Sequence, residues 1–202
     1  MSALPRATLV ALLFGALTVA MAAPWSLHPA SRVVTDNPDT HLFLWTLGWD
    51  AHAFTTAPLR IFDANIYHPL PNTLAYSENL IGSALLAAPV IWLTGDLVLA
   101  LNLVLLVSCA LCGVGAYVLG RALGLGRSAA LVCGLVFAFA PTRFYRMSQL
   151  HLDAVQWMPF CLAFLHRYLD AGRPRDLRLA IAAFTLQALT SGHGAVMLAV
   201  AL

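Results

Sequence analysis

Long runs of apolar residues, separated by short polar segments, extend over almost the whole chain. The run Leu97–Leu119 is longer than the roughly 20 helical residues that cross the hydrocarbon layer of a membrane. Asp96 precedes this run at the position of an N-cap, and Gly120 with Arg121 follows it as a closing signal. Five more apolar runs predict helices at 7–23, 80–93, 129–140, 154–169 and 177–202. The pattern predicts an all-α chain.

Composition places most of these helices in lipid. Hydrophobic residues make up 60% of the chain and charged residues 10%, with a mean hydropathy of +0.80. Soluble domains carry roughly a quarter charged residues, so this chain has too few to cover a water-facing surface. We therefore predict a polytopic transmembrane helical bundle in contact with membrane lipid. The basic residues are all arginines scattered between apolar runs, which excludes a nucleic-acid-binding face.

The chain divides into three parts of a single transmembrane module, residues 1–202. Residues 1–23 form a first anchor, for which a cleaved signal peptide is the alternative. Residues 24–95 form a long exported loop, and residues 96–202 contain the helical spans. Because the last residues lie within an apolar run, we expect the module to be part of a longer protein.

Arginine placement predicts the orientation, because positively charged loops stay in the cytoplasm. If the run 80–93 does not cross the membrane, seven of the eleven arginines are cytoplasmic; if it crosses, only three are. The run has 14 residues and contains Pro89, so a re-entrant or interfacial helix is the preferred interpretation. This orientation places most acidic residues outside: Asp36, Asp39, Asp50, Asp63, Glu78, Asp96 and Asp153. A site on the external face, most simply of a bacterial plasma membrane, is expected.

The exported loop is rich in aromatic residues, which favour the membrane interface. Thr40–Phe54 predicts a helix that lies along the membrane, with Leu44, Leu47 and Ala51 on one face. The turn Asp36-Asn37-Pro38-Asp39 precedes it, and Asp39 or Thr40 is the expected cap. The proline-rich segment that follows predicts an extended loop. Three further acids of this region are interpreted as solvated loop charges: Asp50, Asp63 and Glu78.

This order of anchor, acidic external turn, interfacial helices, proline-rich loop and short spans resembles the GT-C superfamily of membrane glycosyltransferases. The matching segments are VVTDNPDTHLFLWTLGWDAHAF, IFDANIYHPLPNTLAYSENL, RALGLGRSAALVCGLVFAFAPTRF and HLDAVQWMPFCLAFL. The resemblance implies transfer of a sugar from a polyprenyl-phosphate donor to an acceptor on the non-cytoplasmic face. The chain departs from the superfamily at SGHG, residues 191–194, which offers only His193 where relatives often have a basic residue.

The acidic turn is the best match, and the resemblance implies that Asp36 and Asp39 are catalytic. Sugar transfer needs a base for the acceptor hydroxyl, and a partly desolvated carboxylate can serve. Alternatively, the two aspartates bind a divalent metal, Mg²⁺ or Mn²⁺, that neutralises the phosphate. A helix cap at Asp39 and a simple turn residue at Asp36 are the structural alternatives.

The second external loop supplies the expected substrate-binding residues. Arg143 and Arg146 are candidates for phosphate contacts, because guanidinium groups match phosphate oxygens; interfacial anchoring is the alternative. His151 and Asp153 lie where members of the superfamily often carry another acid, and capping of the next helix is their alternative.

Two other functions compete with the transferase. A transporter or flippase usually has polar residues within its spans, whereas only Asn102 and Gln187 stand out as polar here. A non-catalytic membrane scaffold with a partner-binding external loop is the other alternative.

Overall fold

The computed structural model describes residues 6–202, and this range is 76% helical without a strand. The prediction of an all-α chain is confirmed, while the first five residues of the predicted anchor lie outside the described range. The longer helices are α1 (Arg6–Met21), α2 (Pro38–Thr56), α3 (Ile81–Thr94), α4 (Leu97–Ala122), α5 (Arg127–Phe139), α8 (Trp157–Ala171), α9 (Pro174–Thr190) and α10 (Gly192–Ala201). The short helices α6 (Pro141–Arg146) and α7 (Leu150–Asp153) connect α5 to α8.

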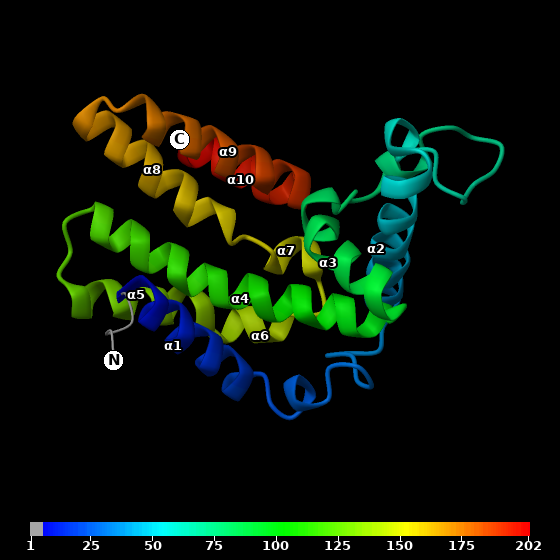
Figure 1. Cartoon of the computed structure of the whole chain (residues 1–202), viewed down its shortest axis with the longest axis horizontal. Helices are drawn as coiled ribbons and strands as arrows, with labels where there is room; N and C mark the ends of the chain where they lie inside the picture. Colours follow the sequence, from blue (N-terminus) through cyan, green and yellow to red (C-terminus); the bar gives the residue numbers. More distant parts are fainter. Residues whose placement is uncertain (1–5) are drawn as a thin grey trace.

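Helix α4 is the centre of the molecule (Figure 1): α1, α5 and α8 pack along it, α9 packs on α8, and α10 on α9. Asp96 caps α4 as predicted, since Leu99 N donates to Asp96 Oδ1 at 2.8 Å. The predicted end at Gly120 is slightly early, because α4 continues to Ala122 and the chain turns at Gly124, where φ is +82°.

Two glycines allow α1 to pack closely against α4 and α5. A Cβ atom on Gly113 of α4, or on Gly134 of α5, would overlap the ring of Phe14. Phe14 is completely buried, so its ring fills the notch that the missing side chains leave. These small residues serve helix packing, as expected for closely approaching helices.

The last apolar run forms two helices rather than one. The break falls at Ser191, whose extended backbone (φ −161°, ψ 124°) ends α9. Ser191 Oγ then accepts a hydrogen bond from Gly194 N at 3.0 Å and caps α10. A serine before two nearby glycines disrupts a helix locally, because serine bonds its own backbone and glycine is a poor helix former.

Helix α2 forms as predicted, with Leu47 and Ala51 each 1% exposed. Its N-cap is Asn37, which accepts from Thr40 N at 2.9 Å; the predicted caps Asp39 and Thr40 are wrong. Pro38 occupies the first helical position, where its fixed φ suits the helix and its missing N–H costs nothing, and this places the cap one residue before it.

The helices α2 and α3 lie together at one end of the molecule, where α2 runs across the end of α4 (Figure 1). The turns between α4 and α5 and between α8 and α9 lie at the opposite end. Arg121, Arg127 and Arg173 belong to these two turns. The acidic turn before α2 and the arginine-bearing turns are therefore at opposite ends of the bundle.

Two helical stretches are long and apolar enough to cross a membrane: α4, and the combined stretch Arg127–Arg146 formed by α5 and α6. Helices α1, α3 and α10 are apolar but shorter. By length and composition, α4 is the more hydrophobic of the two stretches, with a mean hydropathy of 2.6 against 1.4.

Asp50 on α2 is not the solvated loop charge that the sequence suggested. Its side chain is completely buried, and neither carboxylate oxygen has a hydrogen-bond partner within residues 6–202. Burial raises the pKa of this carboxyl from 3.8 to about 8, because the charged form would lose its water. Asp50 is therefore a neutral acid at pH 7.

We expect the free energy of unfolding to decrease as the pH rises from about 4 to about 8. Over this interval the folded chain holds the Asp50 proton and the unfolded chain does not, so stability falls by up to about 1.4 kcal/mol per pH unit. The substitution Asp50→Asn, which keeps the shape without a titrating group, should flatten this slope in denaturant titrations in detergent micelles. Asp63→Asn is the control, because Asp63 is bonded by Arg60 and Asn72 and its pKa is lowered. An unchanged slope in Asp50→Asn would contradict the assignment.

Candidate functional site

Two segments that are more than 100 residues apart meet at the α2 end of the molecule. Asn37 Nδ2 donates to Ser148 Oγ at 3.3 Å, and Gln149 Nε2 donates to Asp39 Oδ2 at 3.2 Å. Asn37 and Asp39 belong to the acidic turn, and Ser148 and Gln149 precede α7. The structure thus brings together the two segments that contain the candidate residues.

Gln149 also connects Asp39 to Arg146. Arg146 Nη1 donates to Gln149 Oε1 at 3.3 Å, while the amide nitrogen of the same side chain donates to Asp39. The side chain of Gln149 therefore bridges a candidate catalytic carboxylate and a candidate phosphate-binding cation. Arg146 is exposed and Asp39 is partly exposed, so both remain accessible to a ligand.

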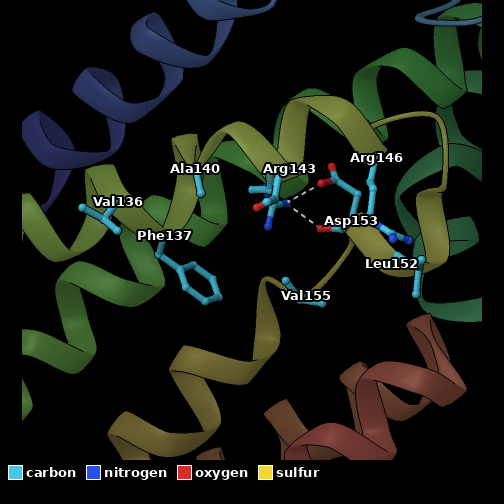
Figure 2. A pocket seen from close by; sticks show the side chains of 9 residues that line it. Val136, Phe137, Ala140, Arg143, Arg146, Leu152, Asp153 and Val155 are labelled. Carbon is cyan, nitrogen blue, oxygen red and sulfur yellow. Dashed lines mark hydrogen bonds and ion pairs between the residues drawn. The ribbon is translucent and has the colours of Figure 1, made fainter.

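Arg143 and Asp153 form a buried ion pair (Figure 2), with Nη2 3.2 Å from Oδ1 and side chains 10% and 1% exposed. The same nitrogen donates to the backbone oxygen of Asp153 at 2.5 Å. Burial raises the pKa of the Asp153 carboxyl, and the Arg143 guanidinium beside it acts in the opposite direction. This pair joins α6 to α7. Arg143 therefore makes a buried structural contact, whereas Arg146 is exposed.

The alternative interpretation of His151 and Asp153 as caps of the following helix is wrong. Helix α8 begins at Trp157, and its N-cap residue Gln156 makes no side-chain cap hydrogen bond. The Asp153 side chain pairs with Arg143 and not with the start of α8.

A cavity of about 430 Å³ lies beside the ion pair. Figure 2 shows Val136, Phe137 and Ala140 from the α5 side facing Leu152 and Val155 across it. Arg143, Arg146 and Asp153 supply its polar lining together with Thr142. The cavity therefore combines a mostly apolar wall with two guanidinium groups.

Asp36 does not share the contacts of Asp39. Its side chain is 80% exposed, and Oδ1 lies 2.7 Å from His41 Nε2. The two aspartates are therefore engaged by different partners, His41 and Gln149. Residues 6–202 also contain no cluster of three or more side chains of metal-binding type. The metal alternative for Asp36 and Asp39 stays a prediction, and we derive no step through a metal.

A third contact joins the segment before α3 to the start of α10. Glu78 Oε2 accepts from Gly192 N at 2.8 Å, and Glu78 Oε1 lies 2.5 Å from His193 Nδ1. Glu78 is thus bound at the N-terminus of α10, and its interpretation as a solvated loop charge is wrong. The partners are 114 and 115 residues away from Glu78, so no local pattern could have paired them; the only sequence signal was the histidine in SGHG.

His151 lies between the acidic turn and this contact. Its ring centroid is 5.2 Å from that of Phe43 and 5.5 Å from that of His193. Burial lowers the pKa of His151, and a charge on His193 lowers it further. The negative charges of Glu78 and Asp39 raise it by amounts smaller than the effect of burial. Burial therefore favours the neutral form of this imidazole.

No protein-family model, curated protein or solved structure matches this chain. A carboxylate oriented by Gln149, an accessible guanidinium, a neutral imidazole and an apolar cavity can together bind a phosphate group attached to an apolar chain and accept a proton beside it.

Proposed function

We propose that this chain acts as an integral membrane glycosyltransferase that moves a sugar from a polyprenyl-phosphate donor to an acceptor on the non-cytoplasmic face. The observation that supports this proposal most strongly is the bridge Arg146–Gln149–Asp39 next to the apolar cavity. It combines phosphate recognition, proton removal and a surface for a prenyl chain at one place.

The proposed orientation follows the distribution of charge over the bundle. In a multi-pass arrangement, the arginine-bearing turns after α4 and α8 face the cytoplasm of a bacterium. The helices α2 and α3 then lie at the external interface, and α1, α4, α5, α8 and α9 with α10 contribute five or six hydrophobic helices. The low content of charged residues and the two apolar stretches of sufficient length support this arrangement.

In the proposed reaction the donor phosphate binds Arg146 and the prenyl chain lies against the apolar wall. The acceptor O–H bond breaks, its proton passes to Asp39, and the acceptor oxygen forms a bond to the anomeric carbon. The bond from that carbon to the phosphate oxygen breaks, and its electron pair stays on polyprenyl phosphate. Arg146 stabilises the negative charge that develops there, since guanidinium groups form charge-assisted hydrogen bonds to phosphate.

The two polar residues within the predicted spans favour the enzyme over a transporter. Asn102 Nδ2 donates to the backbone oxygens of Pro29 and Arg32 at 2.7 and 2.6 Å, and Gln187 Nε2 donates to Ala154 O at 3.0 Å. Both amides therefore hold neighbouring segments of the backbone. Ion-coupled transporters instead use such groups along a pathway.

The substitution Arg146→Gln should weaken binding of undecaprenyl phosphate to the full chain in detergent micelles by ten- to a hundredfold. A hydrogen bond to a charged group contributes about 1.5–3 kcal/mol, which corresponds to this range. Affinity for undecaprenol, which has the same chain without the phosphate, should stay the same. Arg60→Gln is the matched control, because Arg60 is an exposed arginine of the exported loop whose ion-pair partner among residues 6–202 is Asp63. Equal binding of the phosphate and the alcohol by the unchanged chain would refute the donor assignment.

A further inference from the structure

A second cavity lies at the opposite end of the bundle from the candidate site. It has a volume of about 350 Å³ and is lined by Tyr117, Val118, Arg121 and Ala122 of α4 and by Arg167 of α8. Two guanidinium groups from different helices therefore meet at one cavity. Because α4 ends at Ala122 and α8 at Ala171, the cavity lies near the two turns that contain Arg121, Arg127 and Arg173.

The Arg167 guanidinium is held in place by neighbouring side chains. Arg167 Nη2 lies 3.4 Å from Asp176 Oδ1, and Arg173 Nε lies 3.0 Å from Asp176 Oδ2. The Asp176 side chain is only 4% exposed. The Arg167 guanidinium also lies over the Phe164 ring, 5.8 Å from its centroid. A cation fixed by a buried carboxylate and an aromatic ring is oriented before any ligand binds.

Few negative charges lie near the second guanidinium, that of Arg121. Arg121, in the last turn of α4, donates to the backbone oxygen of Leu125 and makes no ion pair with the acids of residues 6–202. The acids of this end are Asp176, shared by Arg167 and Arg173, and the exposed Asp170 at the end of α8. The cavity therefore keeps an excess of positive charge.

We propose that this cavity binds the phosphate of an anionic phospholipid headgroup from the cytoplasmic leaflet. The inference relies on the membrane orientation of the proposed function, which places this end at the inner surface. Basic pockets between transmembrane helices on the cytoplasmic side suit such headgroups, and the guanidinium geometry matches phosphate oxygens. Val118 and the apolar surface of α4 next to it offer a place for the acyl chains. Arginines that only anchor a helix at the interface would not need to converge on a cavity.

The test uses the full chain in detergent micelles, with retention of single phospholipids measured by native mass spectrometry. Phosphatidylglycerol is the anionic probe, phosphatidylcholine the zwitterionic one, and glycerol 3-phosphate a soluble phosphate competitor. The unchanged chain should retain phosphatidylglycerol at least tenfold better than phosphatidylcholine. Arg121→Gln should reduce this preference by tenfold or more, and this variant leaves the contact of Arg167 with Asp176 intact.

Arg175→Gln is the matched control, since Arg175 is an exposed arginine of the same end that does not line the cavity. It removes the same charge and should change the preference less than twofold. Equal losses in Arg121→Gln and Arg175→Gln would overturn the site in favour of general surface charge. Equal retention of both phospholipids by the unchanged chain, or displacement of phosphatidylglycerol by millimolar glycerol 3-phosphate, would also overturn it.

These outcomes are separate from those for the donor site. Failure of the headgroup site leaves the preference for undecaprenyl phosphate and its dependence on Arg146 unchanged. Failure of the donor site leaves the effect of Arg121→Gln on phosphatidylglycerol unchanged.

Discussion

Asp39→Asn is expected to reduce sugar transfer from a polyprenyl-phosphate donor by a factor of about 10² to 10⁴, the usual contribution of a general base. Asparagine keeps the size of the side chain and can still interact with Gln149, but it cannot accept the acceptor's proton. Asn37, and not Asp39, caps α2, so the substitution leaves the start of the helix intact. The loss should therefore appear in turnover rather than in the amount of inserted protein.

Asp36→Asn is the matched comparison, since it removes the same charge three residues away. Asp36 lies before α2, is exposed and contacts His41 in the first turns of that helix, while Asp39 is connected to Arg146 through Gln149. We expect Asp36→Asn to lower the rate of sugar transfer by less than about tenfold. A larger loss requires a group that acts as the general base next to the reacting atoms. The measurement is transfer of a labelled sugar in membranes with equal protein levels. If Asp39→Asn and the double variant Asp36→Asn with Asp39→Asn both remain as active as the unchanged chain, the site assignment is wrong. A scaffold role then becomes the better explanation.

Arg143→Gln is expected to lower the free energy of unfolding by about 3–5 kcal/mol, the usual effect of removing one partner of a buried ion pair. The substitution leaves the Asp153 carboxyl, whose side chain is 1% exposed, without its cation. It also removes the hydrogen bond from Arg143 Nη2 to the backbone of Asp153. The contact between α6 and α7, which positions Gln149, should loosen as a result.

Denaturant titration of the full chain in detergent micelles measures this effect, and Arg60→Gln is its control. The pair Arg60–Asp63 is exposed, with Arg60 76% accessible, and the loss of such a surface pair changes stability by less than about 1 kcal/mol. The double variant Arg143→Gln with Asp153→Asn should recover part of the loss, since it no longer buries an unpaired charge. Similar small losses in Arg143→Gln and Arg60→Gln would show that the Arg143–Asp153 pair does not hold the site together.

Much of the helical architecture could be predicted from local patterns. The apolar run that became α4 and its cap at Asp96 depend on interactions within a few residues, because a helix satisfies its backbone internally and its first N–H groups bond to the residue just before it. The same holds for α2, whose buried face follows from the spacing of Leu47 and Ala51. The local patterns were less reliable where two signals competed, as at Asn37 and Asp39, where the proline between them decided which residue became the cap.

The residues of the candidate site could be predicted from the sequence, but the side chains that contact them could not. Asp39, Arg143, Arg146, His151 and Asp153 all lie at or near the acidic turn and the α6–α7 segment, as the order of segments suggested. Gln149 was overlooked because a glutamine in a polar stretch is unremarkable until two charged side chains are found on its two amide atoms.

Apart from the break at Ser191 in the last apolar run, local sequence patterns predicted the helical class, most helix ends to within a few residues, and the separation of acidic and arginine-rich segments. These depend on hydrophobic periodicity, capping and charge, which act over one or two turns of helix. Three features could be seen only in the folded molecule: Asp50 is buried, Glu78 binds the start of α10, and Arg143 pairs with Asp153. Such contacts depend on which faces meet when distant helices pack, because burial and partner set the state of a polar group, and neither is encoded in its neighbours along the chain.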